Sequence, residues 1–218
     1  ILENLSYQGH KIAEFLLEWR QISKLKNTYS ESLPTFVNNK TKRVHTSYAS
    51  ATTLTGRLSS NDPNLQNIPI RTEIGREIPK SFIAEENNNI LSADYSQVEL
   101  RVLAHMSEDD SLIDAFINGE DIHTRTAVEI FGTTAERLDA EARRMAKAVN
   151  FGIVYGLSAF GLSRQLKIFP KEAKKFIDKY FELYKNVKIY MERTVEDARD
   201  TGYTLTLMNR KRYLPDLN

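Results

Sequence analysis

Residues 90–106 read ILSADYSQVELRVLAHM, and the spacing of the apolar side chains changes within this stretch. Residues 90–95 follow an Asn-rich turn and predict a short strand. From Val98 to Met106 the apolar residues recur at helical spacing and predict a helix. Asp94 would then end the strand just before the helix, where a rigidly held carboxylate suits Mg²⁺. The simpler interpretation, that Asp94 only caps the helix, is favoured when this residue is taken alone.

Toward the N-terminus, residues 9–29 carry apolar side chains at helical spacing and predict a helix whose apolar face packs on a core. The Ser-Leu-Pro sequence at residues 32–34 is expected to end it. Residues 37–83 are rich in Thr, Ser, Asn, Gly and Pro and predict extended or looped chain, which at this length is often functional. Some of its side chains suit the sugar–phosphate backbone and minor-groove base edges, or alternatively form a turn that hydrogen-bonds to itself. These are Arg57, Asn64, Gln66 and Asn67.

Toward the C-terminus the sequence predicts a series of helices. An aromatic stripe there is expected to lie in the core: Phe176, Ile177, Tyr180, Phe181 and Tyr184. Residues 203–207 and 212–214 flank Asn209 as in a hairpin. Strand and loop, then helices, then strand indicate an α+β fold with a helical insertion into a sheet domain. The expected helix boundaries are a cap at Ser107 with an end near Gly119, a cap at Asp121 with an end at Gly132, a cap at Thr134 with a helix through Ala148, and a start at Pro170.

Residues 143–156, RRMAKAVNFGIVYG, combine cations and aromatic rings at one spacing. Arg143, Lys147, Phe151 and Tyr155 are four residues apart, so on a helix they share one face. Cations suit phosphates, and rings suit a sugar and a base. The glycines in this stretch indicate close backbone approach or a bend. An amphipathic helix with a solvated basic end explains the pattern equally well, and both interpretations stay open.

His123 follows Asp121 at the predicted start of a helix. A histidine there could donate to a phosphate, helped by the helix N-terminus. A lone histidine at a helix start is more often only a surface residue.

Composition excludes some classes of protein. The 30 basic and 29 acidic residues nearly cancel, so any basic surface must be local. The absence of cysteine excludes disulfides and thiolate metal sites and fits a cytoplasmic protein. No apolar run approaches the roughly 18–20 residues that span a membrane, and no secretory signal is predicted. The lack of an initiating Met suggests a fragment.

Five segments, taken in order, closely resemble the signatures of family A DNA polymerases of the bacterial DNA polymerase I type. They are TGRLSSNDPNLQNIP, SADYSQVELR, GEDIHTRTA, RRMAKAVNFGIVYG and RKRYLPD. The resemblance covers essentially the whole chain and implies a right-hand polymerase core. By that resemblance residues 1–47 are the base of the thumb and its passage to the palm, 48–104 palm, 105–200 fingers, and 201–218 a hairpin returning toward the palm.

The resemblance implies template-directed DNA synthesis in replication or repair, with primer–template DNA and deoxynucleoside triphosphates as partners. It further implies a monomer that acts at the nucleoid in the cytoplasm, with no membrane partner, and a two-metal mechanism using Mg²⁺. Asp94 matches the first of the family's two metal-binding aspartates, and the Tyr95 carbonyl matches a further metal ligand. Glu99 matches the residue that excludes a 2′-hydroxyl, and Gln97 belongs to the same nucleotide-binding motif.

The other roles are carried over in the same way. Arg143, Lys147 and His123 match the groups that hold the triphosphate, and Lys147 also matches a proton donor to the departing pyrophosphate. Phe151 matches the ring beside the sugar, and a Phe there implies poor use of dideoxynucleotides. Tyr155 matches the residue beside the templating base. Gly152 and Gly156 give it room, and the family's duplex-contacting loop corresponds to Arg57, Asn64, Gln66 and Asn67.

One departure from the family pattern concerns the second metal aspartate, which lies in a His-Asp-Glu turn downstream of RKRYLPD. These 218 residues contain no such turn after that motif. We therefore expect the truncated palm to leave the isolated chain inactive or nearly so. Two alternatives stay open: a non-catalytic nucleic-acid-binding module on the same fold, and a relative of single-subunit RNA polymerases, against which Glu99 argues.

Overall fold

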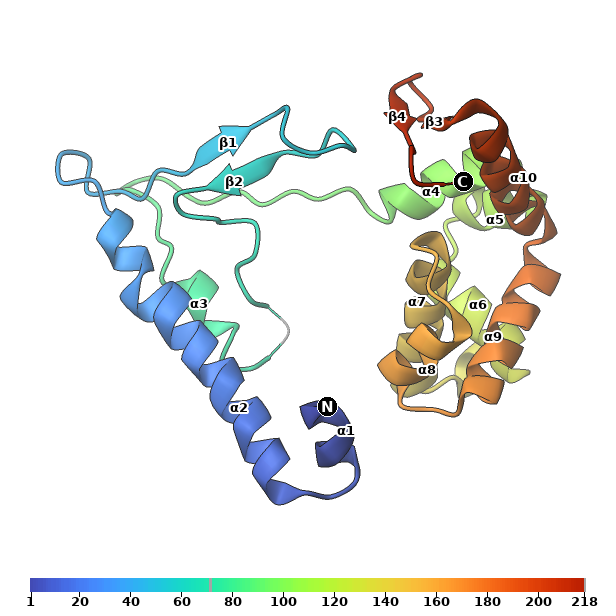
Figure 1. Ribbon diagram of the computed structural model, residues 1–218, viewed down its shortest axis with the longest axis horizontal. Helices are drawn as coiled ribbons and strands as arrows, with labels where there is room; N and C mark the ends of the chain where they lie inside the picture. The colour runs from blue at the N-terminus through green and yellow to red at the C-terminus, as the bar shows by residue number, and fades with distance from the viewer. Residues whose placement is uncertain (71, 218) are drawn as a thin grey trace. The chain divides into compact units, whose positions relative to one another are not determined.

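The computed structural model describes residues 1–70 and 72–217, which form two compact units, Ile1–Ser92 and Ala93–Asn218 (Figure 1). The first holds mostly loops with a few helices and one two-stranded sheet. The second is largely helical and ends in another two-stranded sheet. Helices with small antiparallel sheets make the fold α+β, as predicted. The thumb, palm and fingers boundaries stay predictions.

The first unit is built around α2 (Lys11–Leu25), which follows the short α1 (Leu2–Tyr7). A π-helical turn, η1 (Lys26–Glu31), and a 3₁₀ turn, η2 (Leu33–Phe36), end the helical stretch where Pro34 was expected to end it. Tyr29 is buried, and its hydroxyl donates to the Asn67 carbonyl. This bond fixes the loop beside the helix.

Residues 37–83 are mainly irregular, as predicted, but they contain a hairpin that the sequence did not indicate. Strand β1 (Ser47–Ala49) pairs antiparallel with β2 (Ser59–Asn61), and Tyr48 lies opposite Ser60. Ser60 is fully buried. Its Oγ lies 2.7 Å from Thr46 Oγ1, where either hydroxyl could be the donor. A one-turn helix, α3 (Glu77–Lys80), follows.

The prediction that α2 buries its apolar face in a core is wrong for the described residues of this unit. Phe15 is 61% exposed and Trp19 is 64% exposed, while Ala13 is the buried residue of the helix. Periodicity shows which side chains share a face, but burial also needs a second element to cover that face. Here the neighbouring segments of the unit are α1 and η1, which pack along the ends of α2.

The predicted strand at residues 90–95 is also wrong. The segment is extended, no described strand pairs with it, and Leu91 and Tyr95 are 92% and 82% exposed. An apolar, extended sequence becomes a strand only when a neighbouring backbone accepts and donates the ladder hydrogen bonds.

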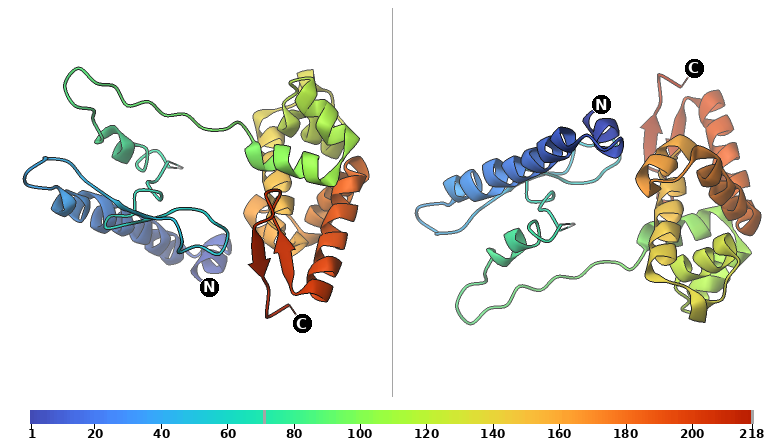
Figure 2. Two further views of the ribbon diagram at one scale, coloured as in Figure 1. Left: turned by 90° about the horizontal axis from the view of Figure 1, so that it is seen from above. Right: turned by 90° about the horizontal axis from the view of Figure 1, so that it is seen from below.

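The second unit packs its helices around one core (Figure 2). Leu100, Leu112, Ile122, Leu162 and Tyr180 are almost fully buried there. Helices α9 and α10 lie beside the others, and the hairpin follows α10. The elements are α4 (Val98–Ser107), α5 (Asp110–Ile117), α6 (Ile122–Phe131), η3 (Ala135–Arg137), α7 (Ala140–Val154), α8 (Ala159–Leu166), α9 (Pro170–Leu183), α10 (Lys185–Thr201), β3 (Tyr203–Leu205) and β4 (Lys211–Tyr213).

Several predictions for this unit are confirmed. Asp121 caps α6, Gly132 ends it in the left-handed conformation, and Pro170 is the first residue of α9. The hairpin forms with Asn209 at its turn. In the aromatic stripe, Phe176, Tyr180 and Tyr184 are buried, and Ile177 and Phe181 pack partly buried against the same core.

Two predicted caps are wrong. Helix α5 is capped by Asp109, whose carboxylate accepts from the Leu112 amide at 3.1 Å, rather than by Ser107, which still belongs to α4. Thr134 precedes only the short η3, and α7 begins after Asp139 and extends to Val154. In both cases the aspartate directly before the helix caps it, because its carboxylate lies closer to the free amides of the first turn.

Asp109 also joins two helices that are distant in sequence. Its second oxygen accepts from the Asn186 amide at the start of α10 at 3.0 Å, and Asn186 Nδ2 donates to the Glu108 carbonyl at 3.0 Å. One nearly buried carboxylate therefore satisfies the N-termini of both α5 and α10. Among the described residues, no helix is long and apolar enough to cross a membrane.

Candidate active site

Helix α7 presents the predicted cation and aromatic face. Asp139 begins the helix by accepting from the Ala142 amide at 2.6 Å. Ala146, Val149 and Ile153 turn to the core, and the four predicted site residues follow the adjoining side of the helix. Phe151 is partly buried against the core, and Tyr155 directly follows the last residue of α7. At the C-terminal end of this face, the Phe151 and Tyr155 rings are stacked with centroids 6.4 Å apart.

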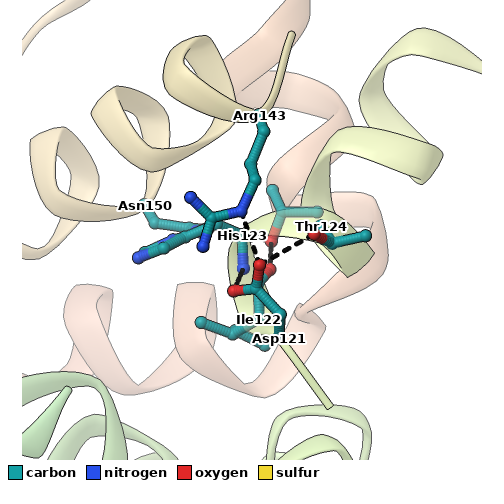
Figure 3. Close-up of polar contacts among 7 residues, drawn as sticks. Asp121, Ile122, His123, Thr124, Arg143 and Asn150 are labelled. Atoms are coloured by element: carbon teal, nitrogen blue, oxygen red, sulfur yellow. Dashed lines mark hydrogen bonds and ion pairs between the residues drawn. The ribbon is translucent and has the colours of Figure 1, made fainter. Parts of the chain in front are cut away.

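Arg143 stands at the N-terminal end of this face and forms an ion pair with α6. Its Nε donates to Asp121 Oδ2 at 2.6 Å, as Figure 3 shows. The same carboxylate accepts from Thr124 Oγ1 at 2.8 Å and from the His123 amide at 3.2 Å. Partial burial raises the pKa of Asp121, but the hydrogen bonds from Arg143, Thr124 and the His123 amide, with the charge of Arg143, outweigh it and lower that pKa overall.

His123 is not a surface residue: only 3% of it is exposed. Its ring lies 5.6 Å from the Phe151 ring, and its Nδ1 lies 2.9 Å from Asn150 Nδ2. Burial lowers the pKa of His123 to about 4; Asp121 opposes this shift, and Arg143 and Lys147 add to it. The imidazole is therefore neutral at pH 7, beside two cations that keep it so.

Glu99 on α4 meets the end of α7, because the Tyr155 hydroxyl donates to Glu99 Oε2. These two residues line an open pocket of about 280 Å³ together with Val98, Val102 and Val154. The sequence placed both residues in one site, and the structure brings them into contact.

The two glycines of the motif differ in their packing. Gly156 adopts a left-handed backbone with φ of 69°, just after α7. Gly152 is buried, and a Cβ there would lie 3.2 Å from Leu157 Cδ2. The space that Gly152 leaves is thus taken by the turn leading to α8.

Asp94 and Tyr95 lie in the exposed extended segment before α4. Helix α4 begins after Gln97, whose backbone is left-handed, so Asp94 is not its cap. A carboxylate and a carbonyl are the oxygen ligands that Mg²⁺ takes, and their chemistry fits that ion. Within residues 1–70 and 72–217 there is no group of three or more His, Cys, Asp and Glu side chains that could hold a metal by itself.

Four of the predicted DNA-contacting residues lie in a loop of the first unit, and much of their hydrogen bonding is internal. The other two, Gly152 and Tyr155, lie at the end of α7 in the second unit. The Gln66 amide nitrogen of the backbone donates to Asn64 Oδ1 at 3.0 Å, and Gln66 Nε2 donates to the Leu58 carbonyl at 3.2 Å. The alternative of a turn that hydrogen-bonds to itself therefore describes Asn64 and Gln66. Arg57 and Asn67 are exposed in the same loop. Their role toward DNA stays a prediction.

Sequence reasoning missed Asp121 and Asn150 as members of the site. Asp121 was expected only to cap α6, and its pairing with Arg143 joins residues 22 apart that no periodicity relates. Asn150 did carry a signal: it is a polar residue on the core side of α7, between Ala146 and Ile153. Such a side chain needs a hydrogen-bond partner inside the protein.

A helical unit that carries this face, with small antiparallel sheets, has the architecture of part of a polymerase domain. The chain belongs to DNA polymerase family A, whose sequence model matches residues 1–218. It is 53% identical over 218 residues to DNA polymerase I of Geobacillus stearothermophilus and 48% identical over 218 residues to that of Pseudomonas aeruginosa. All of the chain is covered in both cases, but only 25% and 24% of those proteins.

The chain is also similar to a solved structure. The POL domain of Pol1 from M. smegmatis, in complex with DNA primer–template and dNTP, matches with a TM-score of 0.89 and 42% identity. The match covers 100% of this chain and 38% of that one. The chain thus spans about a quarter of the length of the curated relatives it matches.

Proposed function

We propose that the protein containing these residues catalyses template-directed DNA synthesis, in replication or repair. The primer 3′-hydroxyl attacks the α-phosphate of a deoxynucleoside triphosphate, the new phosphodiester bond forms, and pyrophosphate leaves. The observation that carries the proposal is the α7 face, where Arg143 and Lys147 precede the stacked rings of Phe151 and Tyr155. Membership of DNA polymerase family A supports it.

The cationic end of the face holds the triphosphate. Arg143 is kept in place by Asp121, and Lys147 is one helical turn further along the same face. Both neutralise the charge that develops on the phosphates in the transition state. Lys147 in addition gives a proton to the departing pyrophosphate. His123 binds a phosphate oxygen as a neutral donor.

The aromatic end receives the sugar and the base. Phe151 lies beside the sugar, and because it lacks a hydroxyl we expect poor use of dideoxynucleotides. Glu99, held by Tyr155, blocks a 2′-hydroxyl and so selects deoxynucleotides, since that hydroxyl is what separates the two sugars. Gln97 and Gly152 support this region, and Tyr155 lies beside the templating base.

Asp94 and the Tyr95 carbonyl would hold Mg²⁺. When bound, the metal activates the primer hydroxyl and neutralises charge on the phosphates. Because these 218 residues contain no His-Asp-Glu turn after residue 216, we propose that a polypeptide of these residues alone is inactive or nearly so. Primer–template DNA contacts Arg57, Asn64, Gln66 and Asn67, and the protein acts as a monomer at cytoplasmic DNA.

The test is Mg²⁺-dependent addition of one nucleotide to a primed template by the complete protein. We expect Asp94→Asn to lower the rate by about a thousandfold or more, as for loss of a group that acts in the transition state. Asp200→Asn, on the exposed end of α10, is the matched control and should leave the rate unchanged. Equal rates for the two variants would refute the role of Asp94.

A second candidate, a non-catalytic nucleic-acid-binding module, is favoured by one observation. Asp94 lies outside any cluster of three potential metal-binding side chains among the described residues. For such a module, Asp94→Asn would leave DNA affinity unchanged and no extension would be found in the unsubstituted protein. A single-subunit RNA polymerase would instead incorporate ribonucleotides in the same assay.

A further inference from the structure

Asn150 lies at the centre of a buried hydrogen-bond chain that reaches His123. It is 1% exposed and projects from the core side of α7 toward the first turn of α6 (Figure 3). Its Nδ2 is 2.9 Å from His123 Nδ1, and its Oδ1 is 3.1 Å from Thr126 Oγ1. Thr126 is itself 3.3 Å from the Tyr184 hydroxyl. The chain therefore joins α6, α7 and the end of α9.

The hydrogens of this chain determine which ring nitrogen of His123 carries a proton. An amide Nδ2 can only donate, so the Nδ1 that faces it must be an acceptor, and the neutral ring then carries its hydrogen on Nε2. The opposite amide orientation would place Oδ1 against Nδ1 and leave Nε2 as a bare acceptor. Thr126 decides between the two when its hydroxyl donates to Asn150 Oδ1.

Tyr184 can donate to Thr126, which leaves the Thr126 hydrogen for Asn150. The two hydroxyl oxygens lie 3.3 Å apart, where either could be the donor, and the Tyr184 phenol carries a hydrogen at pH 7. Thr126 Oγ1 also lies 2.8 Å from the Ile122 carbonyl, a bond that a threonine within a helix can make to the residue four positions earlier. A hydroxyl has one hydrogen, so donation to Asn150 takes the place of donation to Ile122. Donation along the chain from Tyr184 to Thr126 to Asn150 to His123 satisfies every one of these side chains.

The other nitrogen of the His123 ring keeps contact with solvent. The buried side-chain polar atoms without a hydrogen-bond partner, among the described residues, are Gln97 Oε1 and Tyr180 Oη. His123 Nε2 is not one of them, and no hydrogen bond to it is formed by the described residues. Nε2 therefore keeps a small contact with solvent, although only 3% of His123 is exposed, and a hydrogen on it has no acceptor among the described residues.

We propose that Asn150 is a positioning residue that holds His123 as the neutral tautomer with its hydrogen on Nε2, so that the ring donates to a phosphate oxygen of the triphosphate. This rests on the proposed function. With the hydrogen on Nδ1, the bare Nε2 would face the phosphate with a lone pair, and the two acceptors would repel each other. The charged groups facing the ring are Asp121 at the start of α6 and Arg143 and Lys147 on α7.

The direct test is ¹⁵N NMR of the histidine rings in the full chain, which has four histidines. We expect His123 in the unsubstituted chain to be neutral at pH 7 with its hydrogen on Nε2. Asn150→Asp replaces the donor with an acceptor, so the hydrogen should move to Nδ1, and the ring should become protonated at a higher pH. Asn118→Asp adds the same carboxylate at the exposed end of α5 and should leave the His123 signals unchanged.

A second variant guards against misfolding at position 150. Thr126→Val keeps the shape of the side chain but removes the hydroxyl that orients the Asn150 amide, and we expect a mixture of the two tautomers. A His123 ring in the unsubstituted chain that is charged at pH 7, or that carries its hydrogen on Nδ1, would overturn the proposal. So would an unchanged tautomer in both variants.

Nucleotide affinity separates this proposal from the proposed function. In the complete protein on a primed template, Asn150→Asp should weaken triphosphate binding by about tenfold, as for loss of a hydrogen bond to a charged group. If the unsubstituted protein bound no triphosphate, the proposed function would fail, and so would the phosphate-binding role of His123. The tautomer measurement would still decide whether Asn150 positions the ring.

Discussion

The two units of the chain differ in how their apolar side chains are used. In Ala93–Asn218 the helices enclose a core that includes Leu112 and Tyr180, whereas in Ile1–Ser92 the longest helix leaves Phe15 and Trp19 mostly exposed. The predicted triphosphate and sugar residues lie on the packed unit. Four of the predicted DNA-contacting residues, the Arg57, Asn64, Gln66 and Asn67 set, lie on a loop of the other. Both units contain helices with apolar residues at helical spacing. Such a helix can hold a site rigidly only where other elements pack on its apolar face.

Truncating one leucine to alanine in each unit should give the largest difference in the free energy of unfolding. Leu112→Ala opens a cavity in the core, and we expect it to lower the free energy of unfolding of its unit by about 2–5 kcal/mol. Leu16→Ala, on the exposed face of α2, should cost less than about 0.5 kcal/mol. Urea unfolding followed by far-UV circular dichroism, with fluorescence of the single tryptophan, Trp19, reporting on the other unit, measures both. Equal losses would remove the distinction between the units.

Loss of the Asp109 carboxylate, which accepts from the starts of both α5 and α10, should have the next largest effect on stability. Asp109→Ala frees the amides of Leu112 and Asn186 at the starts of two helices, and we expect a cost of about 2–3 kcal/mol because each lost cap costs up to about 2. Asp110→Ala, at the exposed neighbouring position, is the control and should change stability by less than about 0.5 kcal/mol. Thermal unfolding of the two variants compares them directly, and a cost for Asp109→Ala no larger than that of the control contradicts the shared cap.

Acid should destabilise the unit that holds His123. The folded pKa of about 4 lies below the usual 6.5, so the unfolded chain binds the proton more tightly. The contribution of His123 to the free energy of unfolding is therefore fully present above pH 6.5 and is lost as the pH falls through 4. The loss is at most about 3 kcal/mol, since one pKa unit corresponds to about 1.4 kcal/mol. The lowered pKa of Asp121 adds a further loss at lower pH, below the usual range of a carboxyl.

Unfolding measured at pH 7 and pH 5, with His123→Phe as the comparison, tests this. The variant should lose the part of the pH dependence that belongs to this ring. A pH dependence that is the same in both proteins would show that His123 is not buried and neutral.

The smallest effect is expected in the loop of the first unit. Gln66→Ala removes one exposed hydrogen bond to the Leu58 carbonyl and should cost about 0.5 kcal/mol or less. The measurement is the Trp19 fluorescence transition in urea. A cost above about 2 kcal/mol would mean that the loop is as tightly packed as the helical unit.

Sequence reasoning predicted the helical unit better than the rest. Helix α6, the start of α9 and the final hairpin depend on local signals, namely Asp121, Gly132, Pro170 and Asn209, and these were confirmed. Residues 90–95 failed as a strand because pairing is a property of two segments and not of one.

The candidate site shows the same limit. The face of α7 follows from a four-residue spacing and could be predicted. The Asp121–Arg143 pair and the Asn150–His123 contact join two helices, and nothing in the spacing of either helix indicates which residues of the other it meets. The family motifs assign residues to the site, and that assignment stays a prediction. They do not indicate how those residues are held.

The most direct test of the central claim is triphosphate binding by the α7 face. Equilibrium binding of a deoxynucleoside triphosphate is measured with the complete protein on a primed template, with Lys147→Ala compared with Lys175→Ala on the exposed side of α9. We predict that Lys147→Ala weakens binding by about tenfold or more, since a hydrogen bond to a charged group is lost, and that Lys175→Ala leaves it unchanged. Equal affinities for the two variants would contradict the account.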